Sequence, residues 1–112
     1  MTTTIVKTIS IAKDFSETPG PRARDEGDFS GDEFLEDLLR PAFVEAKEHG
    51  ATLTIDLDGT EGYATSFLES AFGGLAREFD SAEILKVIVF KSDDEPFLVN
   101  EIKGYITDAR KK

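Results

Sequence analysis

The sequence predicts an α/β sandwich, in which a small mixed or partly parallel sheet of about four strands packs against three main helices. Three observations support this fold class. Short segments alternate apolar and polar residues as half-buried strands do, and longer segments repeat apolar residues at helical spacing. The two kinds of segment also follow each other in turn along the chain, which favours right-handed crossovers between parallel strands.

Size and composition indicate a single domain that covers residues 1–112. The 112 residues are 39% hydrophobic and include nine Phe, which is enough for one core. There is no Cys, so a disulfide, a thiol nucleophile and a Cys-ligated metal are excluded, and one His leaves little for a histidine metal site. We therefore expect no metal and no cofactor.

Charge and the first residues bear on partners and location. The net charge of −10 repels nucleic-acid phosphates and anionic lipids, both of which bind to basic surfaces. The opening MTTTIVKTISIAK has neither the apolar core of a signal peptide nor the length of a membrane span. These features predict a cytoplasmic protein with no nucleic-acid and no membrane partner.

The first strand is predicted at residues 4–12, because Ile5, Ile9 and Ile11 recur at a period of two. Residues 13–33 then form a polar segment broken by Pro and Gly. Two interpretations of it stay open, a solvated connector and a loop with a short edge strand around residues 20–24.

A first helix is predicted at residues 31–49. Ser30 and Glu33 form a capping-box signature, the apolar residues that follow recur at helical spacing, and Gly50 is a plausible stop. Pro41 removes one hydrogen bond inside this helix, at a cost of about 3 kcal/mol. Since the apolar pattern continues through Pro41, we expect one kinked helix rather than two.

The second half of the chain predicts two more strands and two more helices. A strand at residues 52–57 alternates Leu and Ile with Thr and Asp, and the nearly continuous apolar run at 84–90 is typical of a central, doubly covered strand. Helix two carries one apolar face from Phe67 to Phe79. Helix three carries another from Leu98 to Ala109, with Pro96 suited to its first turn.

The residues DLDGT, 56–60, match the opening motif of the haloacid-dehalogenase-like phosphatases, in which the two Asp are nucleophile and general acid. The resemblance implies a magnesium-dependent phosphoryl-transfer enzyme that uses Asp56 and Asp58. The order of the other groups does not fit, because Lys103 follows the acidic pair at 93–94 instead of preceding it. A turn after a strand explains Asp58 and Gly59 equally well, so we keep the enzyme as the alternative.

The same segment also resembles a STAS domain, the sulfate-transporter and anti-sigma-factor-antagonist fold. There an apolar strand ends in an Asp-containing turn, and a helix begins at a phosphorylatable Ser. In this chain LTIDL is the strand and ATSFL opens the helix, so the resemblance makes Thr65 the first Ser position and Ser66 the phosphoacceptor. Ala64 and Phe67 depart from the family's Asp and Gly. Ser66 as a simple helix N-cap is the structural alternative.

Three longer stretches extend the likeness over nearly the whole chain. ISIAKDFSETPGPR, GDFSGDEFLEDLL and SFLESAFGGL are together similar to a bacterial STAS-like family of unknown function. The resemblance implies a STAS-like sandwich and a non-enzymatic regulatory domain of signalling, similar to anti-sigma-factor antagonists. It also implies a protein partner of the histidine-kinase-like ATPase class.

The turn after the second strand and the second helix supply the candidate contact surface. If the apolar face of that helix covers the sheet, its outward stripe is nearly flat and invites docking. Two Arg of the PRAR segment could pair a phosphate or an acidic partner, although such residues are often just solvated. The candidate partner-binding residues are Asp58, Gly59, Tyr63, Thr65, Ser70, Gly73, Arg77 and Arg22, beside the phosphoacceptor Ser66.

Overall fold

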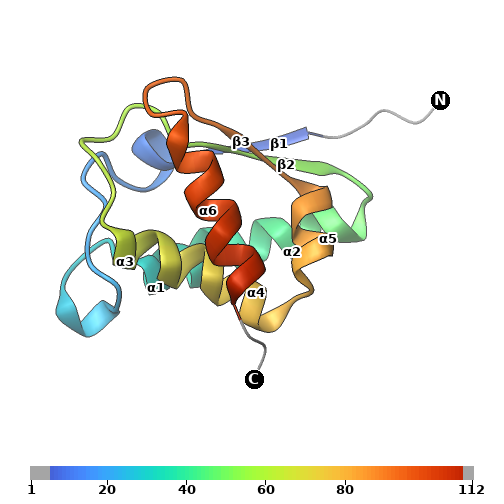
Figure 1. Cartoon of the computed structure of the whole chain (residues 1–112), viewed down its shortest axis with the longest axis horizontal. Helices are drawn as coiled ribbons and strands as arrows, with labels where there is room; N and C mark the ends of the chain where they lie inside the picture. Colours follow the sequence, from blue (N-terminus) through green and yellow to red (C-terminus); the bar gives the residue numbers. More distant parts are fainter. Residues whose placement is uncertain (1–5, 110–112) are drawn as a thin grey trace.

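A computed structural model describes residues 6–109 (Figure 1), and it is an α/β fold. Strands and helices alternate as expected, with short π-helical turns and one 3₁₀ turn between them. The elements are β1 (Val6–Ser10), η1 (Ile11–Phe15), η2 (Arg24–Glu26), α1 (Gly31–Phe34), η3 (Leu35–Leu39), α2 (Arg40–Glu48), β2 (Thr52–Asp56), α3 (Thr65–Leu68), η4 (Glu69–Gly73), α4 (Gly74–Glu78), α5 (Ser81–Val87), β3 (Ile88–Lys91) and α6 (Phe97–Asp108).

The sheet of the described residues has three strands in the order β1-β2-β3, and both pairs are parallel. Sequence patterns predicted about four strands in a mixed or partly parallel sheet. Within residues 6–109 the fourth strand is not found, and the sheet is entirely parallel. All three strands therefore end at the same edge, where Ser10, Asp56 and Lys91 lie in register.

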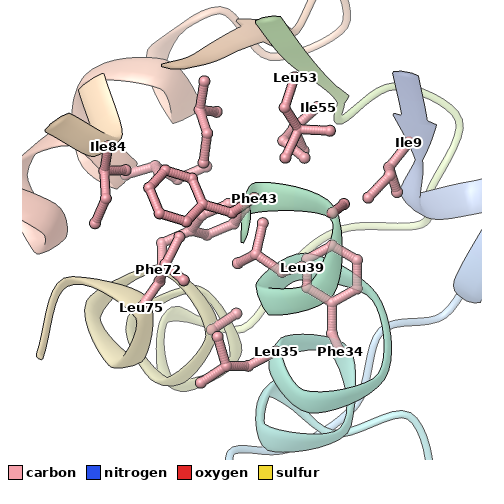
Figure 2. Close-up of a cluster of buried hydrophobic side chains, with 14 of the residues drawn as sticks. Ile9, Phe34, Leu35, Leu39, Phe43, Leu53, Ile55, Phe72, Leu75 and Ile84 are labelled. Atoms are coloured by element: carbon pink, nitrogen blue, oxygen red, sulfur yellow. The ribbon is translucent and has the colours of Figure 1, made fainter. Parts of the chain in front are cut away.

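One face of the sheet carries the core. Ile9, Leu53 and Ile55 point from the strands toward the helices, and Figure 1 shows α1 to α4 on that side. Figure 2 shows these strand residues above Phe43 and Leu39 of the first helix. The opposite face is open: Thr8 and Val89 are exposed there, and Thr54 between them is half-buried. The alternation of apolar and polar residues in β2 thus has a direct physical cause.

The three main helices are confirmed. Helix one is continuous from 31 to 48 through α1, η3 and α2, helix two runs from 65 to 78 through α3, η4 and α4, and α6 is helix three. Pro41 follows the π-helical turn η3, in which the Arg40 N–H bonds to the Leu35 carbonyl. Pro41 donates no backbone hydrogen bond, and the π-helical turn lies just before it. The helix therefore continues past Pro41, and its apolar face continues as predicted.

The prediction for residues 84–90 is wrong in two respects. The first half of that run belongs to α5, whose start is capped by the Asp80 carboxylate accepting from the Glu83 N–H at 3.3 Å. The second half is β3, which is an edge strand with Val89 49% exposed, rather than a central covered strand. An apolar run alone does not separate a buried helix end from a strand.

The first strand is shorter than predicted. β1 ends at Ser10, and the chain turns there because the Ser10 hydroxyl accepts from the Lys13 N–H at 3.2 Å and opens a π-helical turn. Ile11 is still buried, but residues 4 and 5 lie outside the described residues. Residues 20–24 form no strand; η2 is the regular element of this loop.

None of the helices between residues 6 and 109 is both long and apolar enough to cross a membrane.

Candidate functional site

The turn after β2 is shaped by its own residues. The Asp56 carboxylate accepts a hydrogen bond from the Asp58 N–H at 3.0 Å, which closes a local turn at the strand end. Gly59 has φ +91°, a conformation that L side chains rarely adopt, and a Cβ there would lie 3.2 Å from Ala12. Asp56, Asp58 and Gly59 of the DLDGT motif therefore each contribute to the geometry of the turn.

Asp58 joins two loops at the carboxyl edge of the sheet. Its Oδ2 lies 2.9 Å from Lys91 Nζ, and its Oδ1 accepts from the Asp94 N–H at 2.9 Å. Asp94 reciprocates by accepting from the Gly59 N–H at 3.2 Å. The Asp94 N–H, followed by Lys91, lowers the pKa of Asp58 to about 2, and the same contact raises the pKa of Lys91. Asp58 is thus an anion at neutral pH.

Tyr63 fixes the end of the turn against the second helix. Its hydroxyl donates to the Leu57 carbonyl at 2.8 Å, and its ring centroid lies 6.0 Å from that of Phe67. Burial raises the pKa of Tyr63 to about 12. The residue predicted as a contact is therefore half-buried and also holds the turn in place.

The second helix begins at Thr65, with Ala64 as its N-cap. Ser66 is the second residue of the helix, so its interpretation as an N-cap is wrong. Thr65 is exposed and Ser66 is half-buried, and neither hydroxyl forms a hydrogen bond with any residue between 6 and 109. The helix start therefore presents two free hydroxyls beside backbone N–H groups that no side chain caps.

Part of the expected outward stripe is covered by the chain itself. Ser70 is 4% exposed, and its hydroxyl lies 2.5 Å from Asp32 Oδ1 and 3.1 Å from the Arg22 carbonyl. Gly73 is also buried. The expectation of a flat solvent-facing stripe is therefore wrong at these two positions. The Arg22 carbonyl and Asp32 contact Ser70, and the side chains of Glu69 and Arg77 lie beside Gly73.

Residues 19–29 of that loop form a strap, the name used below for this segment. The Gly20 N–H donates to the Phe29 carbonyl at 2.8 Å, which closes the base of the strap. The Gly31 N–H donates to the Pro21 carbonyl at 2.8 Å, and the Asp32 N–H donates to the Arg22 carbonyl at 3.0 Å. These two bonds attach the strap to the start of helix one. These three backbone hydrogen bonds hold the strap in a defined position.

Arg22 of the strap reaches across to helix two. Its Nη1 lies 2.5 Å from Glu69 Oε1, and Arg77 pairs with the other oxygen of the same carboxylate. Burial raises the pKa of Glu69, but hydrogen bonds from Arg22 and Arg77 outweigh this effect, so the pKa of Glu69 is lowered. A Cβ at Gly73 would lie 2.6 Å from Glu69 Oε2. Gly73 therefore makes room for the carboxylate.

The structure brings the predicted site residues into two neighbouring groups. Asp58, Gly59 and Tyr63 belong to the turn after β2. The second group lies around Glu69 on helix two and consists of Ser70, Gly73, Arg77 and Arg22. Thr65 and Ser66, at the start of helix two, follow the turn and precede Glu69. Sequence analysis missed Glu69, Asp32 and Lys91, and it considered Asp94 only as part of the acidic pair at 93–94. Of the three missed residues, Glu69 had a signal, because it lies three residues after Ser66 and therefore on the same side of the helix.

The comparisons with known proteins give one match. A family model described as a STAS-like domain of unknown function (DUF4325) matches residues 30–97, which is more than half of the chain. The match begins at the helix-one cap and excludes the strap. No curated protein and no solved structure matches the chain significantly.

Proposed function

Since the chain belongs to the family of STAS-like domains of unknown function, we propose that it is a non-enzymatic regulatory domain of bacterial signalling. It acts in the cytoplasm by docking a protein partner, in the manner of anti-sigma-factor antagonists. The proposed partner is a histidine-kinase-like ATPase, the class that STAS domains bind in partner-switching systems. Phosphorylation of Ser66 by that partner is the proposed switch.

The free hydroxyl of Ser66 is the observation that carries this proposal. The buried Ser30, Ser70 and Ser92 each use their hydroxyl in a hydrogen bond, to the Glu33 N–H, to Asp32 and to the Glu95 carbonyl. Ser66 has no such partner among residues 6–109, so modification breaks no contact of the described fold. The hydroxyl therefore has no hydrogen-bonding or capping role among the described residues.

The helix start also suits the product of the reaction. Transfer of the γ-phosphoryl group of ATP to Ser66 Oγ releases ADP and the hydroxyl proton, and it adds roughly −1.5 to −2 charges. Backbone N–H groups and the positive end of the helix dipole favour an anion there by roughly 0.3–1 kcal/mol. The domain would keep its fold while its docking surface gains negative charge.

The proposed docking surface is the turn and the helix start together. Gly59, Ala64 and Thr65 are exposed, and Tyr63 and Asp58 hold the turn in shape from beneath. Because Ser70 and Gly73 are buried, a partner would contact the turn, Ser66 and the guanidinium groups of Arg22 and Arg77 beside Glu69, and not the whole helix.

The alternative, a magnesium-dependent phosphoryl-transfer enzyme, meets a specific difficulty. It needs Asp58 as a general acid, which must carry a proton at the working pH. With both oxygens engaged and a pKa of about 2, Asp58 has no proton to donate near neutrality. We therefore retain the non-enzymatic function as the proposal.

The test compares Ser66→Glu and Ser66→Ala for binding to a purified histidine-kinase-like ATPase from the same organism, by calorimetry. Ser66→Glu should bind at least about tenfold more weakly, because an unpaired charge buried in an interface costs several kcal/mol. Its unfolding free energy should stay within about 1 kcal/mol of wild type, because the helix start accepts the charge. Ser66→Ala should bind normally and take up no phosphate from ATP.

Ser81→Glu is the matched control, because Ser81 also lies at a helix start, that of α5, and is half-buried there. It should bind the ATPase as wild type does. If Ser66→Glu and Ser66→Ala both bind like wild type, Ser66 is no switch and the proposed function fails.

A further inference from the structure

The strap places Arg22 beside the part of helix two that follows Ser66. Arg22 pairs with Glu69, which follows Ser66 by three residues, and its carbonyl lies 3.1 Å from the Ser70 hydroxyl, four residues after Ser66. Residues three and four apart lie on the same side of a helix, with Cβ atoms about 5–6 Å apart. The strap therefore lies against the side of helix two that carries Ser66.

The backbone of Arg22 is fixed while its side chain is accessible. The carbonyl accepts hydrogen bonds from the Asp32 N–H at 3.0 Å and from the Ser70 hydroxyl. The side chain is 48% exposed, compared with 23% for the Glu69 carboxylate that it contacts. The guanidinium can therefore leave Glu69 by rotation of the side chain while the backbone hydrogen bonds of Arg22 stay in place.

Glu69 does not depend on Arg22 alone. Its two oxygens are shared between Arg22 and Arg77, so one carboxylate has two guanidinium partners. If Arg22 turns to another anion, Arg77 still neutralises Glu69, and no partly buried charge is left unpaired. Asp32 is the other anion nearby, and it is already engaged by the Ser70 hydroxyl at 2.5 Å.

We propose that Arg22 is a receptor for the phosphoryl group of phosphorylated Ser66, a role that rests on the proposed function. A phosphate at Ser66 is repelled by Glu69, three residues along the helix, and attracts the guanidinium group of Arg22, which can bind two phosphate oxygens at once. The phosphate thereby fastens the strap to the start of helix two. A partner that docks on this surface meets a different arrangement in the two states.

The experiment uses the full chain with phosphoserine incorporated at position 66 during translation, so no kinase or partner is needed. ³¹P NMR then follows the second ionisation of the phosphate from pH 4 to 8. An opposite charge within about 4–6 Å lowers the pKa of an acid, so the phosphate of the folded protein should titrate at least about 0.5 unit below that of a phosphopeptide of residues 60–72.

Arg22→Gln should remove most of this difference, and Arg22→Lys should retain part of it, since the charge remains but the planar fork is lost. Arg24→Gln is the matched control: Arg24 is in the same strap but pairs with Glu36 and Asp37 on helix one. It should titrate like wild type. Circular dichroism checks that each variant is folded.

The proposal is overturned if Arg22→Gln and wild type titrate alike, or if the folded wild type titrates like the peptide. Because the N–H groups at the helix start also lower the phosphate pKa, the comparison with the peptide can refute the proposal but cannot support it alone. If Arg22→Gln does not fold, Arg22→Lys decides, and a titration identical to that of wild type would overturn the proposal. Either result would leave the docking of an ATPase untouched, and loss of that docking would leave the titration unchanged, so the two proposals fail separately.

Discussion

Gly73→Ala tests whether the buried glycine of helix two exists to accommodate Glu69. Gly73 has ordinary helical angles, φ −64° and ψ −37°, so the backbone accepts Ala without strain. Ala is favoured over Gly inside a helix by about 1 kcal/mol, and this gain is expected wherever the new methyl group has room. At Gly73 it does not, because the Cβ would lie 2.6 Å from Glu69 Oε2.

The magnitude follows from what Glu69 must give up. Its carboxylate is the end of a flexible side chain, so it moves away and weakens its pairs with Arg22 and Arg77. Such pairs are worth roughly 0.2–1 kcal/mol each, which offsets the helix gain. Gly73→Ala should therefore leave the unfolding free energy within about 1 kcal/mol of wild type.

The assay is a double-mutant cycle with Glu69→Ala, read by urea unfolding and circular dichroism. Without Glu69 the methyl group meets no obstacle, so Gly73→Ala should stabilise that background by about 1 kcal/mol. Gly104→Ala is the control, since a Cβ there has nothing within 4 Å, and it should stabilise both backgrounds equally. Equal gains from Gly73→Ala in both backgrounds would refute the reasoning.

Two further predictions concern the turn. The pKa of Tyr63 is about 12 in the folded protein and about 10 in an unfolded chain. Its protonated hydroxyl therefore contributes fully to the unfolding free energy below pH 10, and this contribution is lost as the pH rises toward 12. The difference in unfolding free energy between wild type and Tyr63→Phe should therefore shrink over that range, and a constant difference would contradict the buried hydroxyl. Separately, the protein with magnesium should not hydrolyse an aryl phosphate above background; turnover that disappears in Asp56→Asn would support the enzyme instead.

Local patterns in the sequence were enough for most elements of the fold. The Ser30 cap, the apolar face of helix one and the alternation in β2 each depend on residues a few positions apart, and the structure confirms them. The run at 84–90 failed because apolarity reports burial and not backbone conformation. The run divides at Ile88 because the helix that begins at the Asp80 cap ends at Val87, and the chain then pairs with β2 as the edge strand β3.

The sequence alone determined the fold class, the family likeness and the position of Ser66 near a helix start, since all three depend on neighbouring residues. Only the tertiary structure decided what surrounds that helix. Arg22 meets Glu69 across 47 positions and Ser70 across 48, and no periodicity predicts which loop lies over which helix. Such contacts depend on how the packed helices and strands position the loops between them, so the burial of Ser70 and the contact of Arg22 with Glu69 follow only from the tertiary structure.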